Sequence, residues 1–250
     1  MSTIKFFIFI SLFLLNDSLI SAESQRRINI EDFSGYSVDL LPTGEGSQWR
    51  IFSLTNFSPE YYHVVEENQN RFLRATVSSE MNRKKKAITL IKRLFETDSK
   101  GFKKFYFPKD FPFFQWKWRV NKLPNGSDER IENNSQKKSD SAAGVYVYFQ
   151  KEGQVPQIIK YIWSETLSSG SRFMSPASKD IYQAHLVVLR NGKDHMGEWI
   201  EERVNLIDEY KKEFGAEKEP PRILGIGILT DADSTDTEAA ADYDDFVLTR

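Results

Sequence analysis

Acidic residues gather near the end of the chain, and carboxylate oxygens are the ligands that calcium prefers. Six aspartates follow the apolar segment 223–229: Asp231, Asp233, Asp236, Asp242, Asp244 and Asp245. An EF-hand does not fit them, because the sixth loop position, where glycine makes the sharp turn, is Asp236, and Asp242 stands where glutamate is usual. The pattern therefore predicts a calcium site of another kind, with Asp231 and Asp233 as ligands.

Aromatic residues recur at every second position in several segments. Alternation along a strand puts Phe114, Trp116, Trp118 and Val120 on one face, which we interpret as a core face. Two further pairs each share a face: Tyr146 with Tyr148, and Tyr161 with Trp163. Flat rings on an exposed sheet suit stacking on the apolar faces of sugars. Buried packing has the same period, so these four aromatics predict a ligand platform only if their faces meet solvent.

Carboxylates that could hydrolyse a glycan are numerous, but their spacing does not single out an acid and a nucleophile. An enzyme acting on polysaccharide, of the hydrolase or lyase type, stays as an alternative, with Asp140, Glu201 and Arg203 in a cleft beneath the polar loop 124–140. The three histidines are far apart and show neither ligand nor triad spacing.

Short segments rich in β-branched and aromatic residues must position these side chains. We expect ten strands, at 62–65, 72–77, 87–95, 113–120, 144–150, 157–163, 183–189, 198–203, 223–229 and 245–248. One helix is expected, because Asn205 can cap it and Gly215 can end it. Strands that do not alternate with helices favour an all-β fold, an antiparallel two-sheet sandwich of the jelly-roll kind.

The start of the chain has the pattern of a secretory signal peptide over residues 1–22. Lys5 precedes the apolar run Phe6–Leu15, whose length of about ten residues is half of the roughly twenty needed to span a bilayer. Residues 23–250 then form a single domain of an exported protein, periplasmic or extracellular and not membrane-spanning.

The composition of the chain excludes several kinds of site and partner. The chain has no cysteine, which excludes disulfides and thiolate metal sites. Its formal net charge is -2 and its pI about 6.0, which argues against a nucleic-acid partner, since such proteins need a basic field.

An ordered series of motifs resembles domain-of-unknown-function family 3047, a set of secreted bacterial proteins. The motifs are Phe114–Pro124, Asp140–Phe149 (DSAAGVYVYF), Tyr161–Trp163, Trp199–Arg203 and Leu229–Thr235. The family has arginine just before the Val-Tyr-Val run, where this chain has Gly144. The resemblance implies no established activity.

The two ends of the domain resemble the terminal strands of galactose-binding-like jelly rolls, in segments Ile30–Phe33 and Ala241–Phe246. In many carbohydrate-binding modules of that class, acids from these strands hold a structural calcium. The resemblance implies Glu31 and Asp245 as calcium ligands here, with Asp32 and Asp244 beside them. It favours a non-catalytic protein that binds carbohydrate or another envelope polymer. The alternatives are the polysaccharide enzyme and an envelope structural or assembly protein.

Overall fold

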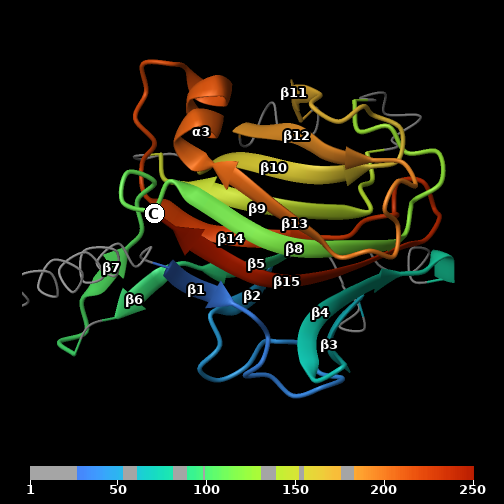
Figure 1. The fold of residues 1–250 in the computed structure, drawn as a ribbon, viewed down its shortest axis with the longest axis horizontal. Helices are drawn as coiled ribbons and strands as arrows, with labels where there is room; N and C mark the ends of the chain where they lie inside the picture. The colour runs from blue at the N-terminus through green and yellow to red at the C-terminus, as the bar shows by residue number, and fades with distance from the viewer. Residues whose placement is uncertain are drawn as a thin grey trace, which may run out of the picture.

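Two β-sheets form most of the computed structural model, which describes residues 27–52, 61–80, 89–97, 99–130, 139–151, 155–175 and 183–250 (Figure 1). One sheet contains β1 (Arg27–Glu31), β3 (Tyr62–Glu67), β4 (Asn70–Val77), β8 (Phe113–Lys122), β13 (Ile200–Asn205) and β15 (Ala239–Thr249). The other contains β2 (Trp49–Phe52), β5 (Thr89–Arg93), β9 (Ala143–Phe149), β10 (Gln157–Ser164), β11 (Arg172–Met174), β12 (Gln183–Asn191) and β14 (Ile223–Leu229). A separate hairpin consists of β6 (Phe95–Thr97) and β7 (Lys103–Phe105).

The strand order explains which residues meet. The six-stranded sheet runs β13-β8-β15-β4-β3, with β1 also paired to β15, and the seven-stranded sheet runs β11-β12-β10-β9-β14-β5-β2. All pairings are antiparallel among the described strands except that of β10 with β12. The predicted two-sheet sandwich is therefore confirmed, with one parallel pair that the sequence did not indicate.

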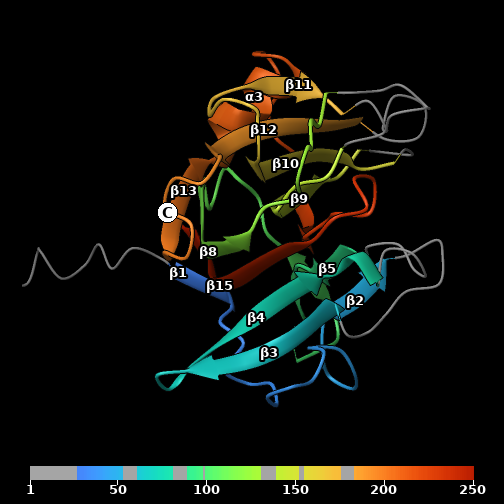
Figure 2. The same cartoon turned by 90° about the vertical axis from the view of Figure 1, so that its right-hand side faces the viewer.

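The two sheets face each other (Figures 1 and 2), and buried aromatic side chains from both belong to one core cluster. The predicted core face of β8 is confirmed, since Trp116 and Trp118 are completely buried. Trp116 packs on Tyr161 of β10 at 5.4 Å between ring centroids, and Trp118 packs on Trp163 at 6.0 Å. Burying one such ring contributes about 1.5–3 kcal/mol, so this aromatic layer is a main source of stability.

The long strand β15 connects both ends of the domain. Its first half pairs with β4 and its second half with β1, and β8 lies along its other side. The register shifts between Asp244 and Val247, where Asp245 has a positive φ of 52°. This bulge lets β15 pair with both β4 and β1, and β1 and β15 lie side by side, as the resemblance to galactose-binding-like jelly rolls implied.

The single predicted helix is confirmed as α3 (Leu206–Phe214). The Asn205 side chain accepts hydrogen bonds from the backbone N–H groups of Ile207 and Asp208 at 3.0 and 3.3 Å, and Gly215 ends the helix with φ of 122°. Such a cap stabilises a helix by about 1 kcal/mol. Tyr210 packs on Phe149, which fixes the helix against the sandwich (Figure 1).

The proposed signal peptide and residues 131–138 of the polar loop lie outside the described residues. Within the described part of the chain, no helix has the length and apolar character that a membrane crossing requires.

Candidate functional site

A groove of about 620 Å³ crosses the outer face of the seven-stranded sheet, the face turned away from the core. The adjacent strands β10, β9, β14, β5 and β2 contribute to it, and hairpin β6–β7 adds residues at its side. Neighbouring strands lie about 4.8 Å apart, so four spacings give the groove a span of about 19 Å. Its rings come from Phe52, Phe95, Phe105, Tyr146 and Tyr148, and its aliphatic residues are Ile91, Val155, Pro156, Ile158, Leu224 and Leu229.

Tyr146 and Tyr148 line this groove on β9, the strand next to β10. Their ring centroids are 6.1 Å apart and their planes differ by 12°. A Cβ at Gly227 would lie 3.0 Å from both the Cε2 and the hydroxyl oxygen of Tyr148, and one at Gly144 would lie 3.5 Å from the Cε2 of Tyr146. Each ring therefore extends over a neighbouring glycine along the sheet, and the nearly parallel pair forms what we call the tyrosine platform.

Gly144 is the position at which the chain departs from the arginine of the resembling family. A Cβ there would lie 3.1 Å from the Cε of Lys160 and 3.2 Å from the carbonyl oxygen of Leu229. Both contacts are tighter than ordinary van der Waals distance, so a larger side chain would have to displace its neighbours. The local packing thus explains the glycine.

The charged side chains of the groove are all cationic. Arg93 and Lys103 line it, and no Asp or Glu is among its lining residues, all of which are described. The ammonium group of Lys103 lies 4.5 Å from the ring centroid of Phe95. Beside the groove, the Arg222 guanidinium lies 3.8 Å from the ring centroid of Phe105. The end of the groove near hairpin β6–β7 consequently has a positive field.

The other two predicted platform residues, Tyr161 and Trp163, are completely buried, so the prediction that they face a ligand is wrong. The strand register gives the reason: Tyr161 pairs with Val145, whereas Tyr146 pairs with Lys160. Tyr161 therefore shares the inward face with Val145, opposite to the tyrosine platform. Alternation within one strand cannot show which of its faces is turned inward.

Asp231 and Asp233, the predicted calcium ligands, come together with Asp140. Ligand oxygens of these three lie within 4.8 Å of one another, and among the described residues this is the one group of three or more that could hold a metal. Burial raises the pKa of Asp231 to about 8, helped by the charges of Asp140 and Asp233. Three carboxylates this close repel one another unless a proton or cation intervenes.

The chemistry of this group fits a hard cation, and each of its members also accepts hydrogen bonds from protein groups. Asp140 is completely buried and accepts hydrogen bonds from the backbone N–H groups of Ser234 and Thr235 at 3.1 and 2.7 Å. Asp231 and Asp233 are half-buried; Asp231 accepts a hydrogen bond from the backbone N–H of Asp233 at 3.1 Å, and Asp233 accepts one from the Ser234 hydroxyl at 3.2 Å. Calcium binding at Asp231 and Asp233 stays a prediction.

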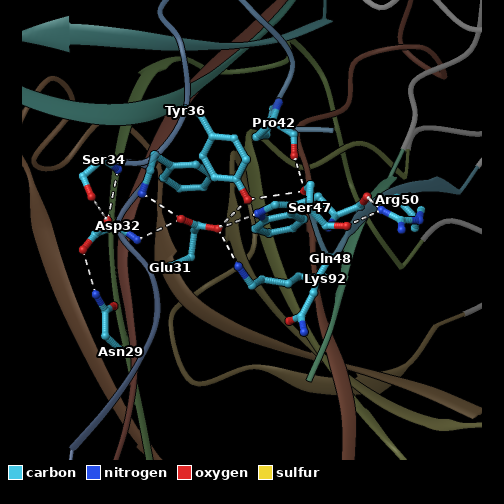
Figure 3. A network of polar contacts seen from close by, with 12 residues as sticks. Asn29, Glu31, Asp32, Ser34, Tyr36, Pro42, Ser47, Gln48, Arg50 and Lys92 are labelled. Carbon is cyan, nitrogen blue, oxygen red and sulfur yellow. Dashed lines mark hydrogen bonds and ion pairs between the residues drawn. The ribbon is translucent and has the colours of Figure 1, made fainter. Parts of the chain in front are cut away.

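The calcium site implied at the terminal strands is not formed, because Glu31 already has a cationic partner (Figure 3). One of its oxygens accepts hydrogen bonds from Lys92 Nζ at 2.6 Å and Trp49 Nε1 at 2.8 Å, and the other accepts one from Phe33 N at 2.9 Å. The Lys92 ammonium takes the place of a metal, so the implied role of Glu31 is wrong.

Asp245 has a different partner from Glu31, although their strands are adjacent. Its carboxylate forms an ion pair with Lys117 at 2.8 Å, and neighbouring Asp244 accepts a hydrogen bond from Asn70. Lys117 therefore neutralises Asp245, whereas the partner of Asp244 is an uncharged amide, and the implied metal role of Asp245 is also wrong.

The candidate residues of the enzyme alternative do not form one site. Asp140 is buried against the loop that precedes β15, whereas Glu201 and Arg203 lie on β13, where Glu201 pairs with Lys117. The Arg203 guanidinium lies 3.4 Å from the ring centroid of Phe113. No hydrogen bond or ion pair joins Asp140 to either residue, and all three are described.

Several groove residues were not predicted: Phe52, Arg93, Phe95, Lys103, Phe105 and Gly227. One signal was present in the sequence of β14, ILGIGIL, where Gly225 and Gly227 alternate with Ile226 and Ile228. A strand that carries glycines on one face and isoleucines on the other is shaped to leave room on the glycine face.

Comparison with solved structures finds distant likenesses among jelly-roll proteins. The carbohydrate-binding module TmCBM61 in complex with β-1,4-galactotriose has 9% identity and a TM-score of 0.31, over 83% of this chain and 92% of that one. The xyloglucanase domain of NopAA from Sinorhizobium fredii has 9% identity and a TM-score of 0.35, over 84% and 100%. Endoglucanase 3 of Trichoderma harzianum, from family GH12, has 8% identity and a TM-score of 0.34, over 83% and 99%.

These likenesses are too low to transfer a ligand or an activity to this chain. None of the curated proteins compared with it matches. The family comparison covers most of the chain: residues 47–247, which include the groove and every strand of the two sheets except β1 and the end of β15, match one family. The chain belongs to the family described as protein of unknown function DUF3047.

Proposed function

We propose that this protein is an exported, non-catalytic carbohydrate-binding protein whose ligand lies in the groove on the seven-stranded sheet. The tyrosine platform is the observation that carries the proposal. Tyr146 and Tyr148 are half-buried, lie nearly parallel and have room only because Gly144 and Gly227 lack side chains. Flat rings held along a sheet suit the apolar C–H faces of pyranose rings.

The dimensions of the groove support a chain-like ligand. A volume of about 620 Å³ is within the usual range for ligand sites, about 300–1,000 Å³. The span of about 19 Å across five strands accommodates several sugar rings in a row. Phe52 and Phe95 provide further ring surface away from the tyrosine platform, and Phe52 is 58% exposed.

Binding without hydrolysis is favoured by the chemistry of the lining. Glycoside hydrolysis by the usual route needs two carboxyl groups on either side of the scissile bond. The lining residues, all of them described, include no Asp or Glu. The groove thus offers surface for holding a glycan, and its polar groups are Thr89, Arg93, Lys103 and the tyrosine hydroxyls.

The test is a glycan-array screen followed by calorimetric titration with the glycans that bind. Replacing both rings, in Tyr146→Ala/Tyr148→Ala, should weaken binding by about 10–100-fold, since each aromatic contact contributes about 0.5–1.5 kcal/mol. Trp199→Ala is the matched control, because Trp199 is a half-buried aromatic that packs on Phe72, a residue of the six-stranded sheet.

A folded protein that binds no glycan on the array would overturn the proposal and favour an envelope structural role. Equal binding by the double variant and the parent would instead move the site away from the groove. Export is tested separately, by N-terminal sequencing of protein recovered from outside the cytoplasm, with Glu23 as the expected first residue.

A further inference from the structure

The charge of the groove indicates what kind of glycan it holds. Arg93 and Lys103 are its charged lining residues, and no carboxylate accompanies them. We propose that the ligand is an acidic carbohydrate chain whose carboxylate groups contact Arg93 and Lys103 while its sugar rings lie on the tyrosine platform. This inference rests on the proposed function and deepens it.

A cationic lining is not what the composition of the chain would produce. The protein has 36 acidic and 34 basic residues, so acids are the more common charged type. Several arginines elsewhere have carboxylate partners: Arg74 and Arg119 bind Asp242, and Arg190 binds Glu202. Arg93 has no ion-pair partner in the described part of the chain, although it is exposed at the end of β5.

The sheet leaves the guanidinium of Arg93 open to a ligand. Its cross-strand neighbour on β14 is Gly225, which has no side chain to cover it. A Cβ at this glycine would lie 2.5 Å from the carbonyl oxygen of Lys92, so close strand approach excludes any larger residue there. A planar guanidinium with an uncovered side can bind a carboxylate through two parallel hydrogen bonds.

Lys103 provides the second positive group, from hairpin β6–β7. Its ammonium lies over the ring of Phe95, two residues along the chain from Arg93, so both cations lie near the β5 end of the groove. A cation over an aromatic ring keeps its ability to bind an anion, because the ring offers no hydrogen-bond acceptor of comparable strength. The groove therefore combines a cationic end with an apolar floor.

The experiment compares uronic-acid polymers with their methyl-esterified forms, which have the same sugars without the charge. Calorimetry or affinity electrophoresis of the purified protein should show about tenfold or tighter binding of the acidic forms, equivalent to about 1.4 kcal/mol. This preference should shrink at about 1 M salt, where the Debye length is about 3 Å. Arg93→Gln/Lys103→Gln should remove the preference and keep residual binding of both forms.

Arg27→Gln/Lys193→Gln is the matched control, because it removes two exposed cations outside the groove and gives the same change in net charge. A control variant that loses the preference as fully as the groove variant would overturn the inference, since overall charge would then be the cause.

Equal binding of the charged and esterified forms would also overturn the inference and leave carbohydrate binding intact. Failure of both forms, together with a blank glycan array, would overturn the proposed function itself. If the protein bound a fatty acid but no glycan, the proposed function would also be overturned, because the ligand of the apolar groove would then be an acyl chain.

Discussion

The outer faces of the two sheets differ in how their charged groups are paired. On the six-stranded sheet, Asp242 is completely buried and accepts hydrogen bonds from Arg74 at 2.7 Å, Arg119 at 2.8 Å and Asn121 at 2.9 Å. Both arginines also bind Glu67 of β3. The face thus holds a closed network in which the positive and negative groups satisfy each other.

The outer face of the seven-stranded sheet has the opposite character around the groove. Its lining cations have no acid beside them, and aromatic rings and glycines take the place of a polar network. Groups that a protein satisfies by itself contribute to stability, whereas charged and ring surfaces left open are suited to a ligand. The comparison teaches that substitutions on the first face should affect folding and those on the second should affect binding.

The largest expected effect is on the closed network. Asp242→Ala would leave the guanidinium groups of Arg74 and Arg119 beside an apolar side chain, and breaking a buried ion pair costs about 3–5 kcal/mol. Chemical denaturation should show a loss of this size in the free energy of unfolding, with glycan binding unchanged under conditions where the variant is folded. Glu66→Gln, in the exposed pair with Arg71, is the control and should cost less than about 1 kcal/mol.

A loss of glycan binding by folded Asp242→Ala protein would break the comparison, because the paired face would then belong to the site. An unfolding free energy like that of the parent would show that the network is not a source of stability.

On the groove face, Gly227→Ala should weaken glycan binding and leave the free energy of unfolding nearly unchanged. The added Cβ would lie 3.0 Å from Tyr148 and displace its ring, which is half-exposed and can move outward. We expect a change of about 1 kcal/mol or less in the free energy of unfolding, because a better strand residue offsets the crowding. Glycan binding should fall several-fold. Gly35→Ala is the control, since nothing lies within 4 Å of a Cβ there; unchanged binding by Gly227→Ala would contradict the platform.

The same contrast explains what the sequence could predict. Helix α3 and the core face of β8 were predictable because their signals are local: a cap at Asn205, a stop at Gly215 and alternation over eight residues. Tyr161 and Trp163 show the limit. Their strand, β10, is buried on both faces, because Leu167 and Val188 cover Ile162 on the outer side, and no pattern within β10 reveals that cover.

The groove could not be predicted as a whole, because five strands and a hairpin from distant parts of the chain contribute to it. Only Tyr146 and Tyr148 were identified in advance. For the acids the outcome was mixed: Asp231 and Asp233 do come together, but with Asp140, which the sequence suggested as a catalytic residue. Glu31 and Asp245 were expected to share a calcium ion by resemblance alone. In the structure they form ion pairs with Lys92 and Lys117 instead.

Carboxylates show a second contrast between paired and unpaired charge. Asp242 has arginine neighbours, whereas Asp231 has Asp140 and Asp233, and its pKa is raised from 3.8 to about 8. Because the folded state holds this proton more tightly than the unfolded state, the contribution of Asp231 to stability should fall as the pH rises from about 4 to 8. Asp231→Asn should flatten that fall, which thermal unfolding across this pH range would measure.

Asp233→Asn is the companion variant and should flatten the pH dependence less, since Asp233 contributes only one of the causes that raise the pKa of Asp231. If calcium binds this group, it should raise the unfolding temperature of the parent near pH 8 and not that of Asp231→Asn. A parent protein whose stability rises between pH 4 and 8, with no change in Asp231→Asn, would contradict the raised pKa.

The smallest effect is expected for Asp245→Asn, which removes the acid of an exposed pair on the six-stranded face. Lys117 and Asp245 are 40% and 36% exposed as side chains, and such pairs contribute about 0.2–1 kcal/mol. The positive φ at this position suits asparagine as well as aspartate, so the bulge in β15 should persist. Thermal unfolding should shift by a few degrees at most, equally in calcium and in chelator, and glycan binding should not change. If calcium raised the unfolding temperature of the parent but not that of Asp245→Asn, Asp245 would be a calcium ligand after all. The acids of the six-stranded face would then not be fully satisfied by protein groups.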